Sequence, residues 1–150
     1  INMAIAQGGE IQSVPGPSAV TAALVVSGLP TDKFAFQGFL PNKKAARVKK
    51  LKLLSAESRT LIFFESCHRI QKTLEDIREV FGDIYVVCVR ELTKKFEEVK
   101  RGAVGEIGDY FSVNKPRGEF VILFNLKMQN TCHREPNFSE AWQSESQILS

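Results

Sequence analysis

Polar side chains capable of acid–base or charge chemistry gather at three points of the chain, each directly beside an apolar run. Residues 65–69 (Glu-Ser-Cys-His-Arg) and residues 90–94 (Arg-Glu-Leu-Thr-Lys) follow apolar runs, and residues 116–119 (Pro-Arg-Gly-Glu) precede one. In open α/β sheets, ligands bind just beyond the carboxyl ends of the strands. If the apolar runs are strands, the three clusters are candidates for one ligand site.

Glu65 and His68 are the candidates for a general base, because carboxylate and imidazole groups commonly accept protons in enzymes. No nucleophile accompanies His68 in the sequence, so a helix-capping or loop-bonding role is the competing interpretation. Glu65 and Glu91 could equally form structural salt bridges with Arg69 or Arg90. The sequence leaves the structural and the functional interpretation open.

The sequence favours neither a metal site nor a phosphate loop. In the pairs Cys67-His68 and Cys132-His133 the two possible ligands are adjacent, whereas metal knuckles need two to four spacer residues. The glycines of residues 8–16 match no phosphate-loop or dinucleotide fingerprint. We therefore expect no metal.

The stretch 14–24 predicts a turn from a strand into a tightly packed helix. Residues 10–14 alternate as in a buried strand, and two prolines around Gly16 then end regular structure. Ser18 is predicted to cap a helix over 18–26, whose small residues allow close approach to a sheet or ligand. The free amides of such a helix start attract polar ligands, although an ordinary turn explains the same residues.

A strongly basic helix is predicted after Asn42, its expected N-cap. Six cations fall within ten residues, and they are Lys43, Lys44, Arg47, Lys49, Lys50 and Lys52. Phosphate backbones favour such a surface because bound cations release condensed counterions. A solvated helix face is the alternative.

Strands and helices alternate along the rest of the chain. Strands are expected at 33–40, 60–65, 84–89, 96–100 (near an edge) and 119–124, and helices at 70–81 and 105–111. This order predicts an α/β domain with a mixed five- to six-stranded sheet and helices on both faces. We expect residues 1–13 to be the end of a preceding domain and a linker strand, residues 14–125 the α/β domain, and residues 126–150 a weakly structured polar tail.

Composition places the chain among ordinary globular proteins. It has 150 residues and a net charge of +3, and no apolar run approaches the roughly 20 residues of a membrane span. The three cysteines do not form a disulfide framework, and Cys88 falls within an apolar strand as a core residue. We predict a cytoplasmic protein with no membrane partner. Residues 1–9 read as the end of a helix without an N-cap, so we expect the sequence to continue a larger protein.

Five motifs in order resemble the ribosomal RNA small subunit methyltransferase I family, within the tetrapyrrole-methylase-like class of S-adenosylmethionine enzymes. They are Val14–Leu24, Phe36–Pro41, Phe63–Arg69, Arg90–Lys94 and Arg117–Phe120. The resemblance covers roughly residues 1–125. Cys67 stands where the family usually has proline, and the sequence from Leu126 onward resembles nothing in the family.

The resemblance implies an α/β fold like the second domain of these methyltransferases, with S-adenosylmethionine held between two domains. It implies methylation of the ribose 2′-hydroxyl of a cytidine in small-subunit ribosomal RNA by a homodimer. The positions that resemble cofactor contacts are Ser18, Ala19, Phe64, Glu65, Ser66, Leu92, Gly118 and Glu119.

The RNA contacts expected on this basis are Lys43, Lys44, Arg47 and Arg69. Two alternatives stay open. One is a methyltransferase of the same fold that acts on a tetrapyrrole or another small molecule, and the other is a non-catalytic RNA-binding or dimerisation module.

Overall fold

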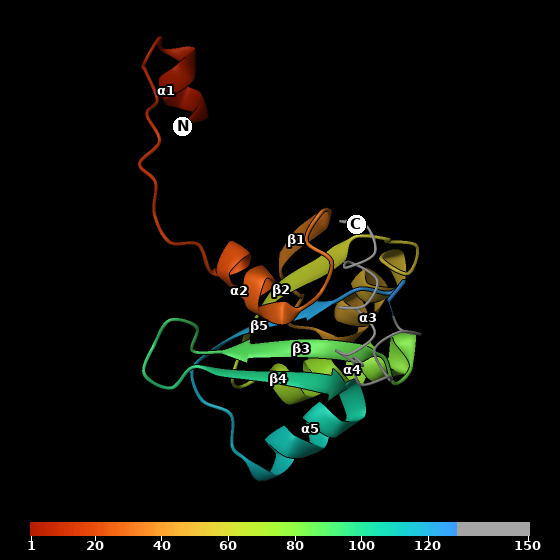
Figure 1. Cartoon of the computed structure of the whole chain (residues 1–150). Coiled ribbons are helices and arrows are strands. Elements are labelled where there is room, and N and C mark those ends of the chain that lie inside the picture. The colour runs from red at the N-terminus through yellow and green to blue at the C-terminus, as the bar shows by residue number, and fades with distance from the viewer. Residues whose placement is uncertain (129–150) are drawn as a thin grey trace, which may run out of the picture.

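The computed structural model describes residues 1–128, which form a five-stranded sheet with helices on both of its faces (Figure 1). The elements in chain order are α1 (Asn2–Ala6), α2 (Ala19–Ser27), β1 (Phe34–Phe39), α3 (Lys44–Leu53), β2 (Thr60–Ser66), α4 (Ile70–Phe81), β3 (Tyr85–Arg90), β4 (Glu98–Ala103), α5 (Val104–Val113) and β5 (Glu119–Phe124).

The strand order is β1-β2-β5-β3-β4. β1 and β2 are parallel, β5 is antiparallel to both β2 and β3, and β4 is antiparallel to β3. β1, β2 and β3 therefore point the same way, and β5 begins at the edge of the sheet where they end. This mixed sheet confirms the predicted fold class, with five strands, and it brings the polar clusters at the strand ends to one edge.

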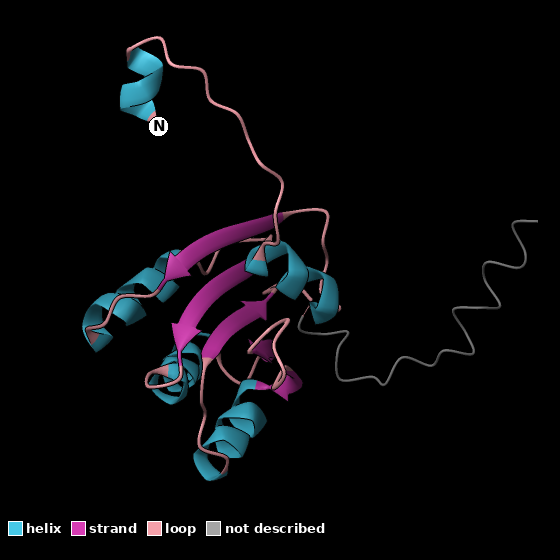
Figure 2. Cartoon of the chain, turned by 90° about the vertical axis from the view of Figure 1, so that its left-hand side faces the viewer, coloured by secondary structure: helices cyan, strands magenta, loops and turns pink. Residues whose placement is uncertain are grey.

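Helices α3, α4 and α5 cover one face of the sheet, and α2 covers the other (Figure 2). Successive residues of β2 face opposite sides of the sheet. Leu61 and Phe63 pack in the first core, on the side of α3, α4 and α5, whereas Ile62 packs in the second core, on the side of α2. The central strands are continuously apolar because both of their faces are buried. Cys88 is 1% exposed and lies in the first core, as predicted.

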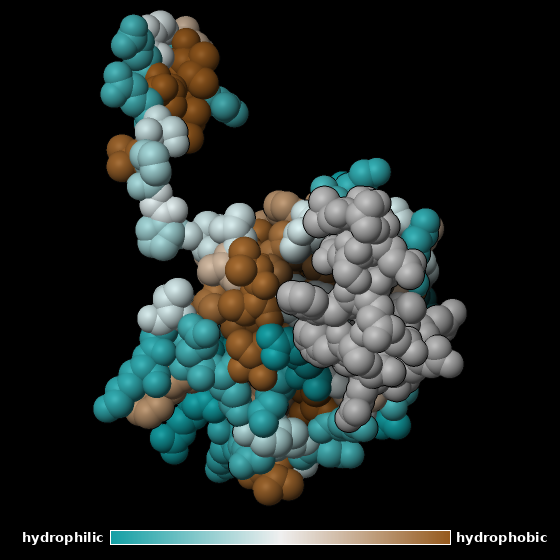
Figure 3. Space-filling view, viewed as in Figure 1, coloured by the Kyte–Doolittle hydropathy of each residue, from teal (hydrophilic) through white to brown (hydrophobic). Residues whose placement is uncertain are grey.

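The predicted strand over residues 10–14 does not form. These residues are exposed and lead away from the sheet to α1, which buries none of its own residues (Figure 1). Figure 3 shows apolar side chains gathered on one side of this short helix. Alternation predicts a strand only where a neighbouring strand is free to pair, and residues 10–14 pair with none of the described strands.

Two predicted caps are also absent. Ser18 is the N-cap residue of α2, yet its hydroxyl makes no capping hydrogen bond. The N-cap of α3 is Lys43 rather than Asn42, because the Asn42 side-chain oxygen accepts a hydrogen bond from Arg69 instead. The Asn42 side chain therefore bonds to the distant guanidinium of Arg69 instead of to a backbone amide of α3.

Helix α4 has the predicted bounds, and β4 is an edge strand as predicted, although it begins two residues later than expected. Residues 129–150, with Cys132 and most of the predicted tail, lie outside the described residues. The predicted domain boundaries remain predictions.

Candidate functional site

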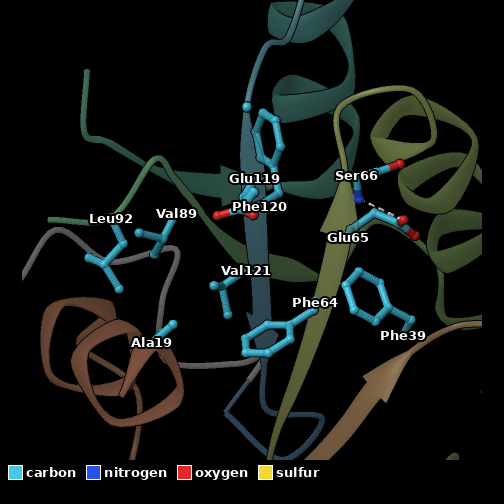
Figure 4. Close-up of a pocket in the computed structure, with 11 residues that line it drawn as sticks. Ala19, Phe39, Phe64, Glu65, Ser66, Val89, Leu92, Glu119, Phe120 and Val121 are labelled. Atoms are coloured by element: carbon cyan, nitrogen blue, oxygen red, sulfur yellow. Dashed lines mark hydrogen bonds between the residues drawn. The ribbon is translucent and has the colours of Figure 1, made fainter. Parts of the chain in front are cut away.

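A cavity of about 340 Å³ opens at the edge of the sheet where β2 and β3 end and β5 begins (Figure 4). We call it the Phe64 cavity. Its lining residues come from five elements and two loops, and they are Ala19, Phe39, Phe64, Glu65, Ser66, Val89, Leu92, Gly118, Glu119, Phe120 and Val121.

The two side walls of the Phe64 cavity are apolar. Ala19 opens α2 with only a methyl group, and Leu92 lies beside it (Figure 4). On the opposite side, the Phe64 ring makes edge-to-face contacts with Phe36 and Phe39, at centroid distances of 4.7 and 5.8 Å. The first residues of β5 form the floor between these walls. A flat apolar ligand would find aliphatic and aromatic surfaces on facing sides.

The loop after β3 is fixed by the carboxylate of Glu91. Its Oε1 accepts a hydrogen bond from the Glu119 amide at 3.0 Å and another from Lys94 Nζ at 3.1 Å. The Glu91 amide donates to the Glu119 carbonyl at 3.0 Å. Glu91 and Thr93 both have positive φ angles, 48° and 64°, so Leu92 sits at the tip of a tight turn beside the cavity.

The same contacts act on the charge of Glu91. The hydrogen bond from the Glu119 amide and the Lys94 ammonium group hold the pKa of the Glu91 carboxyl below its ordinary value. Glu91 therefore stays ionised at neutral pH and remains a strong acceptor for the β5 backbone.

Glu65 is 2% exposed, and each of its oxygens has a partner. Oε1 accepts from the Ser66 amide at 2.8 Å and lies 3.3 Å from Arg69 Nε, while Oε2 accepts from the Thr73 hydroxyl at 2.6 Å. Arg69 also donates to the Leu40 carbonyl. Glu65 and Arg69 thus form the structural salt bridge that the sequence allowed. Through its bond to Leu40, Arg69 also links the end of β1 to the end of β2.

Seven of the eight predicted cofactor contacts line the Phe64 cavity together. The eighth, Ser18, lines an adjoining hollow of about 80 Å³ that shares Ala19 and Leu92 with the cavity. The two base candidates lie in different surroundings: Glu65 is buried and lines the cavity, whereas His68 is exposed and does not line it.

Four lining residues were not predicted, namely Phe39, Val89, Phe120 and Val121. Phe39 stands in a motif that carries the family resemblance, and that motif was the one available signal for it. The other three are ordinary members of apolar strands, so nothing in the sequence distinguishes them from the core.

Residues 2–108 match the family model described as Tetrapyrrole (Corrin/Porphyrin) Methylases. The chain belongs to this family. The match spans α1 to α5, and so it includes every element that lines the Phe64 cavity except β5.

Two curated relatives of this tetrapyrrole methylase chain share one name. Ribosomal RNA small subunit methyltransferase I of Thermotoga maritima is 46% identical over 121 residues, which cover 81% of this chain and 54% of that protein. The Bacillus subtilis (strain 168) protein of the same name is 35% identical over 135 residues, which cover 90% of this chain and 45% of that protein. The predicted resemblance is confirmed, and the chain spans about half the length of these relatives.

Solved structures share the tetrapyrrole methylase fold. Diphthine synthase superposes with a TM-score of 0.62 at 16% identity, covering 83% of this chain and 51% of that one. Cobalt precorrin-4 methyltransferase superposes with a TM-score of 0.58 at 23% identity, covering 81% of this chain and 54% of that one. Uroporphyrin-III C-methyltransferase from Thermus thermophilus, complexed with S-adenosyl homocysteine, gives 0.53 at 16% identity, covering 83% and 57%.

The basic helix of this methylase chain is only partly available to an RNA. Arg47 is 4% exposed, and its Nε donates to Asp76 of α4 at 2.5 Å, so it is not the surface cation that the sequence suggested. The reason is tertiary, since Asp76 follows Arg47 by 29 residues. Lys43 is exposed, and Lys44 is exposed but bonded to Glu79 at 2.9 Å.

Arg69, the fourth predicted RNA contact, pairs with Glu65 and donates hydrogen bonds to Leu40 and Asn42, and 24% of its side chain is exposed.

No helix within residues 1–128 is long and apolar enough to cross a membrane. In the same residues, no three His, Cys, Asp or Glu side chains lie close enough together to hold a metal ion.

Proposed function

We propose that this chain forms one wall of an S-adenosylmethionine cleft in a methyltransferase whose substrate is the ribose 2′-hydroxyl of a cytidine in small-subunit ribosomal RNA. The observation that carries the proposal is the Phe64 cavity, which gathers seven independently expected contact residues at the strand-end edge. Relatives named for ribosomal RNA methylation support the substrate class.

The lining suits the cofactor. Apolar side chains on facing walls, Phe64 and Leu92, suit a purine ring, and the Glu119 carboxylate, which is 86% exposed at the rim, suits ribose hydroxyls as an acceptor. When bound, S-adenosylmethionine supplies a methyl group on a sulfonium centre. The residues of this chain then have to hold and orient it, and Ala19 leaves room because its side chain is a single methyl.

Positioning supplies much of the rate in such a transfer, because the hydroxyl oxygen and the methyl group must be aligned. A general base would assist by taking the hydroxyl proton. Glu65 lines the cavity, but both of its oxygens already accept or pair with neighbours, which supports an orienting role. His68 is exposed, and it remains the base candidate to be tested by substitution.

We propose that the RNA approaches the side of the molecule that carries α3, where Lys43 and the exposed part of Lys44 lie, with Arg69 at the adjoining loop. Cations on one surface attract a phosphate backbone through counterion release. The homodimer and the cytoplasmic location remain predictions, and sedimentation of the purified chain checks the first of them.

An NMR titration of the ¹⁵N-labelled 150-residue chain with S-adenosylhomocysteine tests the cofactor site directly. We expect amide shifts at Ala19, Ser66, Leu92 and Glu119, because these residues line the cavity. Since one wall of a cleft binds weakly, the ligand is raised to millimolar concentration. Unmoved amides at these four positions would overturn the proposed site.

A chimera tests the reaction. The 121-residue segment of this chain that aligns with the Thermotoga maritima relative replaces its counterpart there, and tritiated methyl transfer to small ribosomal subunits is measured. A 2′-O-methyl group makes the adjacent phosphodiester resist alkali, so alkali-resistant dinucleotides identify the methylated ribose. Label in a base, or label accepted only by a tetrapyrrole, would replace our proposal with the small-molecule alternative.

A further inference from the structure

Another cavity, of about 200 Å³, adjoins the Phe64 cavity at Gly118, and we call it the Phe96 cavity. It is lined by Arg90, Glu91, Phe96, Arg117 and Gly118. Gly118 lines both cavities, so the two meet at this residue. A ligand in the Phe96 cavity would therefore lie next to whatever occupies the Phe64 cavity.

The Phe96 cavity offers an aromatic ring to solvent. Phe96 lies in the connection between β3 and β4, and it is 64% exposed. Lys95 Nζ lies 5.6 Å from the centre of its ring. Figure 3 shows mostly hydrophilic residues around this connection, which projects from the sheet in Figure 1. A large apolar ring held in a polar surrounding is a typical platform for a stacked base.

Within residues 1–128, one of the two arginines of the Phe96 cavity is unpaired, and the other, Arg90, is engaged at Nη1 by Glu98. In the described part of the chain, Arg117 takes part in no hydrogen bond or ion pair, and the Arg90 Nε is buried without a hydrogen-bond partner. Glu91 accepts bonds from Lys94 and from the β5 backbone. Glu98, which pairs with Arg90 Nη1 at 3.1 Å, also accepts from the Tyr110 hydroxyl.

We propose that the Phe96 cavity binds one nucleotide of a single-stranded RNA segment, with its base stacked on Phe96 and its phosphate held by Arg117 and the exposed edge of Arg90. This inference rests on the proposed function, because it assigns the nucleotide next to the methylated one to this cavity. Single-stranded RNA is the class that uses an aromatic platform and a cation together. An acidic peptide would use the two arginines but would stack no ring on Phe96.

Fluorescence anisotropy of a short labelled single-stranded RNA, added to the full 150-residue chain, measures the contact. Stacking on one aromatic ring implies that Phe96→Ala weakens binding about 5- to 150-fold, and that Phe96→Trp retains it. Arg117→Gln should lower the salt dependence between about 50 and about 200 mM KCl by about 0.7 in log–log slope, as expected for one lost phosphate contact.

Two controls match these variants. Phe34→Ala removes a 40% exposed phenylalanine of β1 that lines neither cavity, and Lys33→Gln removes an exposed cation beside it. Both should bind RNA as the unchanged chain does. Equal losses in Phe96→Ala and Phe34→Ala would show non-specific contact and overturn the proposal, as would full competition by a poly-glutamate peptide.

Photo-crosslinking with 5-iodouridine RNA and mass spectrometry gives an independent readout, with Phe96 as the expected crosslinked residue. The S-adenosylhomocysteine titration keeps this proposal separate from the previous one. Normal amide shifts at Ala19 with no Phe96 effect on RNA would overturn the nucleotide site alone. Absent shifts at Ala19 with an intact Phe96 effect would overturn the cofactor site alone.

Discussion

Gly118 has no room for a side chain because the carboxylate of Glu91 occupies the space where a Cβ atom would lie. The Glu91 carboxylate is held at this position because its Oε1 accepts a hydrogen bond from the Glu119 amide. This bond joins the loop after β3 to the start of β5. Gly118 also has a φ angle of +83°, which favours glycine. Both residues line the Phe96 cavity, and Gly118 also lines the Phe64 cavity.

Gly118→Ala should therefore disrupt the site more than an equivalent change elsewhere. Gly28 is the matched control, because it has a φ of +74° but open space where its Cβ would be. Both substitutions should cost about 1 kcal/mol in unfolding free energy for the positive φ. Only Gly118→Ala should also weaken S-adenosylhomocysteine binding by tenfold or more, about 1.4 kcal/mol, measured by the NMR titration. Equal effects on ligand binding would contradict the role of the Glu91 contact.

Ala19→Phe should block the cofactor while leaving the domain folded. Ala19 begins α2 and contributes only a methyl group to the wall that faces Phe64 across the cavity, so a ring would fill part of the 340 Å³. Unfolding in urea should stay within about 1 kcal/mol of the unchanged chain, because Ala19 is exposed. Ala45→Phe, at an exposed position of α3, provides the control. Unaltered ligand shifts in Ala19→Phe would remove α2 from the site.

Arg47→Met should destabilise the domain by about 3 to 5 kcal/mol, because it leaves the carboxylate of Asp76 buried without its guanidinium partner. Urea unfolding followed by circular dichroism measures this loss. Replacing both partners, as in Arg47→Met with Asp76→Leu, should restore most of it, because no buried charge then remains.

Lys44→Met is the surface control for that pair. Lys44 is 66% exposed, pairs with Glu79 at 2.9 Å and lies only 3.7 Å from Asp76 Oδ1, a longer and more solvated contact than that of Arg47. Its removal should therefore change stability by no more than about 1 kcal/mol. A loss in Lys44→Met as large as that in Arg47→Met would show that burial does not distinguish the two pairs.

Acid should release the loop after β3. The pKa of the Glu91 carboxyl is held below its ordinary value of 4.5, first by the hydrogen bond from the Glu119 amide and then by Lys94. A carboxyl whose folded pKa is lowered stabilises the fold fully above its unfolded pKa, and that contribution is lost as the pH falls through the folded pKa. The Glu91 contact should therefore be intact at neutral pH and weaken below about pH 4.5.

Carboxyl ¹³C chemical shifts of Glu91 against pH give its midpoint. In Lys94→Met the midpoint should move up toward the ordinary value, because one cation and one hydrogen-bond donor are removed. A midpoint that does not move in this variant would assign the shift to the Glu119 amide alone.

Local patterns in the sequence determined the elements of the sheet. Apolar runs placed β2, β3 and β5 close to their observed bounds, and the amphipathic spacing of residues 70–81 predicted α4 without error. These patterns succeed because each strand or helix must bury one or both of its faces, and that need is written in residues close together in the chain. The five motifs likewise sufficed for the family, and they pointed to most residues of the Phe64 cavity.

Tertiary structure decided which polar residues are available. Arg47 is part of a basic run in the sequence, yet Asp76 from another helix buries it. Asn42 loses its capping role to Arg69, and residues 10–14 find no described strand to pair with. Glu91 and Gly118, 27 residues apart, pack against each other, and both line the Phe96 cavity. A sequence pattern records what each residue prefers, whereas the partner it finds depends on which distant segments the fold brings beside it.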